Sequence, residues 1–183
     1  MKVSKKQFIH DASFSLGNRL ARFVWHIADL LFFKYSPTPC SAYRRLLLNL
    51  LGSSLKKRAS VYPSAKIWYP PNLVMEEGAS IGPGVKVYNQ GLITIGRNAI
   101  VSQGAHLCAS THDYNDPTHP LLLAPINIGA NAWICAEAFI GPGVTIGEGS
   151  VVGARAVVTK DTECWAVYAG NPAKKVKERI RFE

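Results

Sequence analysis

The chain has 183 residues, of which 48% are hydrophobic and 18% charged, and its formal net charge is +9. A chain of this size and composition can bury a core and fits one domain with an N-terminal extension. The four cysteines, Cys40, Cys108, Cys135 and Cys164, form no CxxC pair and no cluster, which argues against a disulfide or zinc framework. The positive charge comes without a recognition helix, an aromatic RNA-binding motif or finger spacing, so we expect no nucleic-acid partner.

Residues 1–58 predict an amphipathic helical extension. Arg19, Arg22, His26 and Asp29 lie on one helical stripe, and apolar residues cover most of the remaining surface between positions 20 and 31. A Ser-Pro-Thr-Pro break precedes a second helix over AYRRLLLNLL, which ends before Gly52. The first helix is too polar to span a bilayer, and no cleavable signal is evident. We therefore expect a cytoplasmic location.

Two interpretations of this extension stay open. One is a cap that covers exposed backbone and apolar side chains at the end of the structure that follows. The other is peripheral contact with the anionic inner face of a membrane, with Trp25, Phe32 and Phe33 at the lipid interface. The sequence does not separate them.

An aliphatic residue recurs at every sixth position in the second half of the chain. The series is Ile128, Ile134, Ile140, Ile146, Val152 and Val158, and each member is followed four positions later by Ala132, Ala138, Val144, Ser150, Ala156 or Thr162. A helix repeats at 3.6 residues and a half-buried strand at two, so a period of six indicates short strands joined by turns. Three such hexads, roughly eighteen residues, close one turn of a triangular coil whose turns stack as parallel strands.

Earlier runs keep the same period with interruptions. They are Val61, Ile67 and Leu73, then Met75, Ile81 and Val87, then Ile95, Val101 and Leu107. One slip falls near Asn89, and a longer one lies between Leu107 and Ile128, where THDYNDPTHPLLLAP contains three prolines. Because proline removes hydrogen-bond donors from a strand, we expect residues 112–125 to loop out from the coil.

His112 is the candidate catalytic residue, since it stands where the last hexad meets this loop. Histidine changes its charge near neutral pH, and general base catalysis contributes about 10²–10⁴-fold in rate. The alternative is that His112 is an ordinary polar loop residue. We assign no role to His106 or His119.

The C-terminal segment is basic. Gly170, Asn171 and Pro172 predict a turn, and a short helix is expected over residues 171–183, with Lys174, Lys175, Lys177, Arg179 and Arg181. Such a charge suits an anionic small molecule.

These motifs resemble those of the hexapeptide-repeat acyltransferases. CASTHDY around His112 is similar to the SHDY or GHP signature of the galactoside, maltose and exopolysaccharide O-acetyltransferases, and VVTKD followed by AGNPAK is similar to their coenzyme A segment. The resemblance to colanic-acid and exopolysaccharide acetyltransferases extends into FFKYSPTPCSAYRRLLLNLLG. It implies an all-β fold, a left-handed parallel β-helix over residues 59–170.

The resemblance also implies an activity: transfer of an acetyl group from acetyl-CoA to a sugar hydroxyl of a surface polysaccharide or its lipid-linked precursor. His112 would be the general base, and no metal is expected. The enzyme would be a homotrimer with active sites at its subunit interfaces. Cofactor contacts are implied for Trp133, Ala136, Ala154, Thr159, Lys160, Asn171, Pro172, Lys174 and Lys177, and acceptor contacts for Asn89 and Asp113.

Two other classes remain open. A γ-type carbonic anhydrase shares the coil and holds zinc with three histidines, for which His106, His112 and His119 are the available residues. A non-catalytic scaffold is the second alternative, because the coil itself carries no chemistry.

Overall fold

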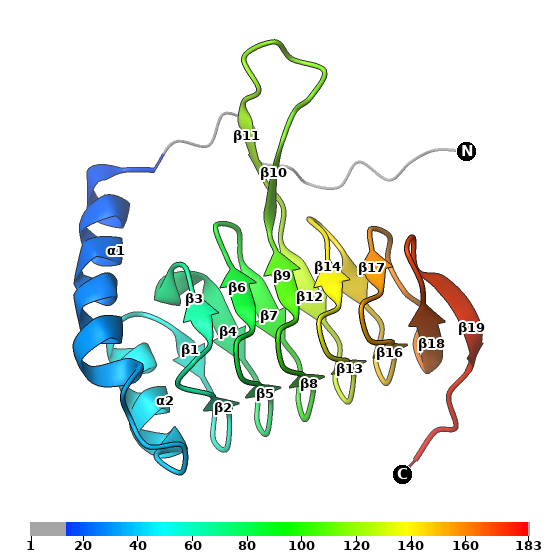
Figure 1. Cartoon of the computed structure of the whole chain (residues 1–183), viewed down its shortest axis with the longest axis horizontal. Coiled ribbons are helices and arrows are strands. Elements are labelled where there is room, and N and C mark those ends of the chain that lie inside the picture. The colour runs from blue at the N-terminus through cyan, green and yellow to red at the C-terminus, as the bar shows by residue number, and fades with distance from the viewer. Residues whose placement is uncertain (1–13, 183) are drawn as a thin grey trace.

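Two helices cover one end of a three-sided prism of short strands (Figure 1). The computed structural model describes residues 14–182. Helix α1 (Leu16–Ala28) continues into a π-helical turn, η1 (Asp29–Phe33), and α2 (Ser41–Leu50) follows. The Ser15 hydroxyl caps α1 by accepting a hydrogen bond from the Asn18 N–H. In the described part of the chain, no helix combines the length and the apolar character that crossing a membrane requires.

The prism has three faces, each a sheet of short strands that pair parallel, except for the antiparallel pair β18–β19. The first face contains β1 (Ser54–Leu55), β4 (Leu73–Met75), β7 (Ile93–Ile95), β12 (Ile126–Ile128) and β15 (Thr145–Ile146). The second contains β2 (Ser60–Val61), β5 (Ser80–Ile81), β8 (Ile100–Val101), β13 (Trp133–Ile134), β16 (Val151–Val152), β18 (Ala166–Ala169) and β19 (Lys174–Glu178). The third contains β3 (Lys66–Ile67), β6 (Lys86–Tyr88), β9 (His106–Cys108), β14 (Phe139–Ile140) and β17 (Val157–Val158).

The sixfold aliphatic series forms the core, as predicted. Ile128, Ile134 and Ile140 are 2% exposed or less, and each pairs with the inward aliphatic of the next turn of the coil. Each turn of the coil therefore contributes one inward aliphatic side chain from each face, and the stacked turns bury a continuous apolar column. The coil of stacked parallel strands expected from the period is confirmed, and so is the fold class that the resemblance implies, a left-handed β-helix.

The interruptions of the period all lie where the chain passes from the third face to the first, here called the third–first edge. The step from Ile67 to Met75 and the step from Val87 to Ile95 each span eight residues instead of six. The first of these turns contains a 3₁₀ helix, η2 (Pro70–Asn72). Leu73 keeps the six-residue step from Ile67 and is fully buried, as the sequence predicts. Met75, two residues later in the same strand, is also fully buried and starts the next six-residue run.

The longest interruption is a β-hairpin that projects from the same edge (Figure 1). Its strands are β10 (Ser110–His112) and β11 (Leu121–Leu123), which pair antiparallel. The expected projecting segment is thus present, and it begins two residues earlier than predicted.

The predicted C-terminal helix is wrong. Residues 174–178 form β19, which pairs antiparallel with β18 and covers the last edge of the second face. Lys175 forms an ion pair at 2.7 Å with Glu163, which lies outside β19, and one at 2.6 Å with Glu178 of the same strand. The exposed main-chain groups of β18 favour a strand here. They form hydrogen bonds with the main chain of residues 174–178, which in a helix would bond within that segment.

The N-terminal helices are anchored to the open end of the prism, as the cap interpretation predicts. Trp25 and Phe33, which were expected at a lipid interface, are 4% and 0% exposed, so that expectation is wrong for these two residues. The Trp25 indole is buried and donates a 2.7 Å hydrogen bond to the Ile67 carbonyl oxygen. Arg44 on α2 is 1% exposed and donates to the carbonyl oxygen of Val61 at 2.6 Å. The prism itself begins at Ser54, a few residues before the expected boundary at residue 59.

Candidate functional site

His112 is the last residue of β10 and is exposed on the hairpin. Its Nδ1 atom lies 2.6 Å from the carbonyl oxygen of His119, on the opposite side of the hairpin tip. A carbonyl oxygen only accepts hydrogen bonds, so in the neutral imidazole Nδ1 carries the proton and Nε2 keeps its lone pair. The hairpin therefore prepares Nε2 as the basic atom.

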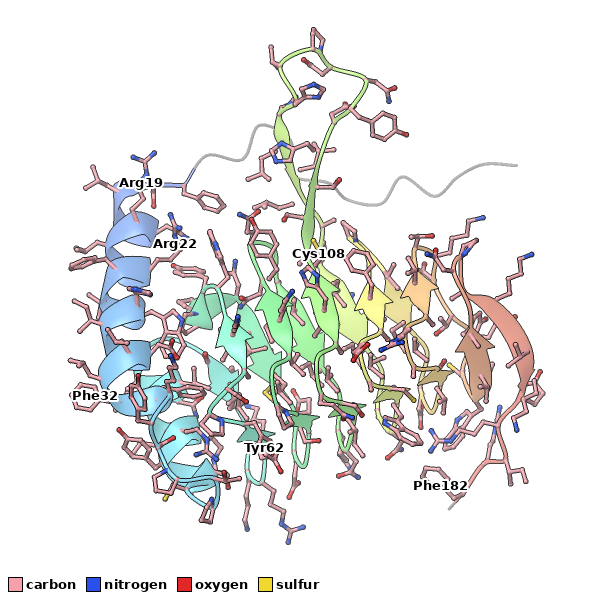
Figure 2. The ribbon with its side chains drawn as sticks, in the orientation of Figure 1. Arg19, Arg22, Phe32, Tyr62, Cys108 and Phe182 are labelled. Atoms are coloured by element: carbon pink, nitrogen blue, oxygen red, sulfur yellow. The ribbon has the colours of Figure 1, made fainter. Side chains whose placement is uncertain are left out.

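Two aspartates shape the hairpin tip that carries the His119 carbonyl. Asp113 accepts a hydrogen bond from the Asn115 N–H at 2.9 Å. Asp116 accepts from the N–H of Thr118 at 2.8 Å and from its hydroxyl at 2.7 Å, and these bonds hold the pKa of the Asp116 carboxyl below its ordinary value. Short-range bonds of this kind fix an irregular loop without a hydrophobic core. Figure 2 shows the hairpin standing clear of the prism, with Cys108 near its base.

A groove of about 370 Å³ runs over the third face, on the strands that precede this edge. Its walls come from three successive turns of the coil: Lys66, Ile67, Trp68, Lys86, Val87, Tyr88 and His106. Burial, and then the positive charge of Lys86, lower the pKa of His106, which favours a neutral ring. The His106 ring packs edge-on against Phe139, with centroids 5.4 Å apart.

The sequence analysis missed this groove and gave His106 no role. A signal was available, because Lys66, Lys86 and His106 recur at intervals of 20 residues, one turn of this part of the coil. Residues at that spacing share one outward column on the prism.

Asn89, a predicted acceptor contact, is fully buried. Its carboxamide oxygen accepts from the N–H groups of Trp68 and Tyr69, each at 3.1 Å, and its amide donates to the Tyr69 carbonyl at 2.6 Å. All of these bonds hold the eight-residue turn that contains η2, and none of them is available to a ligand. We therefore leave Asn89 out of the site proposed below.

The neighbouring Gln90 is better suited to meet a ligand. It is 8% exposed, and its side-chain nitrogen donates to the Tyr88 hydroxyl at 2.8 Å. Its Oε1 is the one buried side-chain N or O atom in the described residues that has no hydrogen-bond partner. A buried carbonyl group without a partner costs about 1–3 kcal/mol, so a ligand donor at this position would be stabilised.

Three of the predicted cofactor contacts form a row, here called the Trp133 row, near the edge between the second and third faces. Trp133 begins β13 on the second face, is 44% exposed, and donates through its indole N–H to the Ser102 hydroxyl at 2.9 Å. Ala136 and Ala154 lie in successive turns at the edge, where the Arg155 N–H donates to the Ala136 carbonyl at 2.9 Å.

The remaining predicted cofactor residues are divided between two places. Asn171 and Pro172 form the turn between β18 and β19, beside the start of β17, and Lys174 and Lys177 are exposed on β19. Thr159 and Lys160 follow β17 at the third–first edge, the same edge as His112. One chain alone therefore does not bring the Trp133 row to the histidine.

Within residues 14–182, no three His, Cys, Asp or Glu side chains lie close enough together to hold a metal ion. His112 and His119 are joined through the main-chain oxygen of His119.

Comparison with known proteins gives the family. The model for bacterial transferase hexapeptide repeats matches residues 125–160. The chain is 37% identical over 167 residues to a protein named for colanic acid biosynthesis, the acetyltransferase WcaF of Escherichia coli (strain K12), with 91% of this chain and 92% of that protein covered. The chain belongs to the hexapeptide-repeat transferase family.

Two further members extend the comparison. The chain is 30% identical over 142 residues to the galactoside O-acetyltransferase of Escherichia coli (strain K12). The matched region covers 74% of this chain and 68% of that protein. A solved galactoside acetyltransferase in complex with coenzyme A superposes with a TM-score of 0.83 at 25% identity, over 94% of this chain and 86% of the other. This hexapeptide-repeat transferase is therefore an acetyltransferase that uses acetyl-CoA.

Proposed function

We propose that the enzyme transfers the acetyl group of acetyl-CoA to a sugar hydroxyl of a surface polysaccharide or its lipid-linked precursor. The observation that carries the proposal is the hydrogen bond from His112 Nδ1 to the His119 oxygen, which leaves Nε2 free to accept a proton. The names of WcaF and of the galactoside enzyme support a sugar acceptor. We place the reaction in the cytoplasm, where acetyl-CoA is available.

The reaction needs one base and no covalent enzyme intermediate. His112 Nε2 removes the proton from the acceptor hydroxyl as its oxygen attacks the thioester carbon. Main-chain N–H groups of a coil turn would stabilise the oxyanion that forms. When the C–S bond breaks, the thiolate of coenzyme A takes the proton from the imidazolium, and the sugar ester and free thiol leave.

The active site would be shared between two subunits of a homotrimer. His112 lies at the third–first edge and the Trp133 row near the second–third edge, so a second copy that presents its Trp133 row to the hairpin completes the site. On this proposal Trp133, Ala136 and Ala154 contact the pantetheine arm of acetyl-CoA, and Asn171, Pro172, Lys174 and Lys177 lie toward its nucleotide. Thr159 and Lys160 lie at the edge that carries the base.

The acceptor would lie between the hairpin and the groove on the third face. The rings of Trp68 and Tyr88 provide flat apolar surfaces, which suit the faces of a sugar ring. Asp113 in the hairpin and the unpartnered Oε1 of Gln90 are the candidate hydrogen-bond acceptors for sugar hydroxyls.

The test is a thiol-release assay with acetyl-CoA and a panel of nucleotide sugars and lipid-linked sugar precursors. We expect His112→Ala to lower turnover by about 10²–10⁴-fold while calorimetry shows nearly unchanged binding of coenzyme A. His119→Asn is the matched control, because it keeps the carbonyl oxygen that His112 uses and tolerates the positive φ of 46° at that residue. Unchanged turnover in His112→Ala would remove His112 from the mechanism.

A further inference from the structure

The positive charge of the chain is concentrated in its N-terminal part. Residues 1–58 contain 11 lysine and arginine residues, two aspartates and no glutamate, which gives a formal charge of +9. Residues 59–183 contain ten basic and ten acidic residues and are formally neutral. The whole net charge is therefore carried by residues 1–58, the part of the sequence that contains the helical cap.

The face of α1 that packs against the prism is its more polar face. Asn18, Arg22, Trp25 and Asp29 follow one another at intervals of three or four residues and are all at least partly buried. The Arg22 guanidinium lies over the Trp68 ring at 4.3 Å, and Trp25 donates to the prism at Ile67. Figure 2 shows Arg22 on the side of the helix that faces the coil.

The opposite face of the helix is apolar and exposed. Its residues, with their exposed fractions, are Leu16 (83%), Leu20 (61%), Phe23 (62%), Val24 (46%), Ile27 (42%) and Leu31 (60%), and Phe32 (54%) continues it. Figure 2 shows Phe32 on the side that faces away from the prism. A helix that served only as a cap would turn this face inward, because burying a large apolar side chain contributes about 1.5–3 kcal/mol.

Basic residues lie near both ends of this apolar face and in the neighbouring turn of the coil. Arg19 is exposed near the start of α1 and Lys34 just after η1. In the first turn of the coil, next to the helices, Lys56, Lys57 and Arg58 are also exposed. An apolar stripe with aromatic rings and a cationic border is the composition of helices that lie in the interface of an anionic bilayer.

We propose that α1 and η1 lie flat on a membrane surface that contains acidic phospholipids, with the face from Leu16 to Phe32 in the acyl boundary and the basic residues against the headgroups. Helix α1 has 13 residues, a length of about 20 Å, so it lies along the surface. This inference goes beyond the proposed function and does not depend on it. It brings the end of the prism to the surface where a lipid-linked acceptor resides.

The test is flotation of the full-length enzyme with phosphatidylcholine vesicles that do or do not contain phosphatidylglycerol. We expect binding to the acidic vesicles that weakens as salt is added, and weak binding to the neutral ones. The variant Leu20→Ser/Phe23→Ser/Ile27→Ser should bind the acidic vesicles at least about tenfold more weakly. Ile180→Ser is the matched control: it removes an 89% exposed apolar side chain from the C-terminal segment and should bind like wild type.

A second variant, Arg19→Gln/Lys34→Gln, leaves the apolar face intact and tests the charge. We expect roughly a fivefold loss of binding to acidic vesicles for each charge removed, and unchanged thermal unfolding. Thiol release with a water-soluble acceptor should stay at the wild-type level in both variants, which separates a failure of this inference from a failure of the proposed reaction.

The inference is overturned if the wild type does not float with acidic vesicles, or if it floats equally well after the apolar or the charged residues are replaced. Light scattering coupled to size exclusion supplies the other decisive outcome. A lower oligomeric mass for the Leu20→Ser/Phe23→Ser/Ile27→Ser variant would show that a second copy of the chain covers this face instead of lipid.

Discussion

The Nδ1 atom of His112 lies 2.6 Å from the main-chain oxygen of His119, so the hairpin tip decides which ring nitrogen is protonated. The atom that accepts this hydrogen bond belongs to the main chain, so no side chain is needed to orient the imidazole. Its position instead depends on the turns that Asp113 and Asp116 stabilise at the tip. Catalysis by His112 should therefore respond to a substitution of Asp116, a residue to which no contact with the substrate is assigned.

Asp116→Ala should lower kcat by about ten- to 10²-fold and leave the KM for acetyl-CoA unchanged. It removes both hydrogen bonds to Thr118, next to His119, and a displacement of about 1 Å in a catalytic group costs up to 10²-fold. Thr118→Val is the graded control, since it loses only the hydroxyl bond and should have a smaller effect. Equal and unchanged kcat values in both variants would show that the tip does not position His112.

Trp133→Ala should raise the KM for acetyl-CoA roughly tenfold, a loss of about 1.4 kcal/mol in binding, while thermal unfolding stays near wild type. The ring is 44% exposed, so it contributes little to the core and is available to a ligand. Trp133→Phe keeps an aromatic surface, loses the bond to Ser102, and should remain close to wild type. Ile100 on β8 pairs with Trp133 on β13, so Ile100→Ala is the control for a nonspecific change of the second face. A KM shift as large in Ile100→Ala as in Trp133→Ala would contradict a specific contact.

Arg44→Met should lower the free energy of unfolding by roughly 3 kcal/mol or more, measured by denaturant titration. The guanidinium is 1% exposed and donates to the carbonyl oxygens of Val61, Pro37 and Thr38 at 2.6, 2.7 and 2.6 Å. The Val61 carbonyl is buried, so leaving it without a donor costs about 1–3 kcal/mol, and the bonds to Pro37 and Thr38, which are exposed residues, each contribute about 1 kcal/mol.

Two controls make this prediction specific. Arg44→Lys should recover only part of the stability, because an ammonium group lacks the planar fork of donors. Arg45→Met should cost less than about 1 kcal/mol, since Arg45 makes a single 3.3 Å bond to the Ala59 carbonyl. Similar losses at Arg44 and Arg45 would refute this account of the cap.

Gly129→Ala should destabilise the coil by about 1–3 kcal/mol, which lowers Tm by several degrees. A Cβ atom at this position would lie 2.6 Å from the Glu148 nitrogen of the next turn, and that neighbour is main chain. Gly17→Ala is the control: a Cβ there meets nothing nearer than 3.8 Å, and the helix should keep or slightly gain stability. Equal Tm values for Gly129→Ala and wild type would mean that the turns can separate at that edge.

Two residues show what a break in the repeat predicts about position and what it does not. His112 was predicted from its place at a break in the repeat, and the structure puts it on a projecting hairpin at that break. Asn89 was chosen for the same reason, but its carboxamide is consumed by the main chain of Trp68 and Tyr69. A break in a periodic pattern locates an edge of the prism and does not say which side chain at that edge faces outward.

The segment from Lys174 to Glu178 shows the limit of local pattern. Its basic composition predicted a helix, yet it forms a strand because the unpaired edge of β18 lies beside it. Long-range hydrogen bonding overrides weak local preference in such a segment.

The sequence by itself determined the coil, its period and the positions of its interruptions, because each hexad repeats one local rule: an aliphatic side chain inward and a small residue at the turn. Only the tertiary structure decided that the interruptions share one edge, that the 20-residue column of Lys66, Lys86 and His106 lines a groove, and that α1 turns its apolar face outward. Those relationships depend on which turns of the coil stack on one another and on which residues anchor the cap. Contacts between the cap and the prism, such as that of Trp25 with Ile67, 42 positions away, are set by packing, and no local periodicity encodes them.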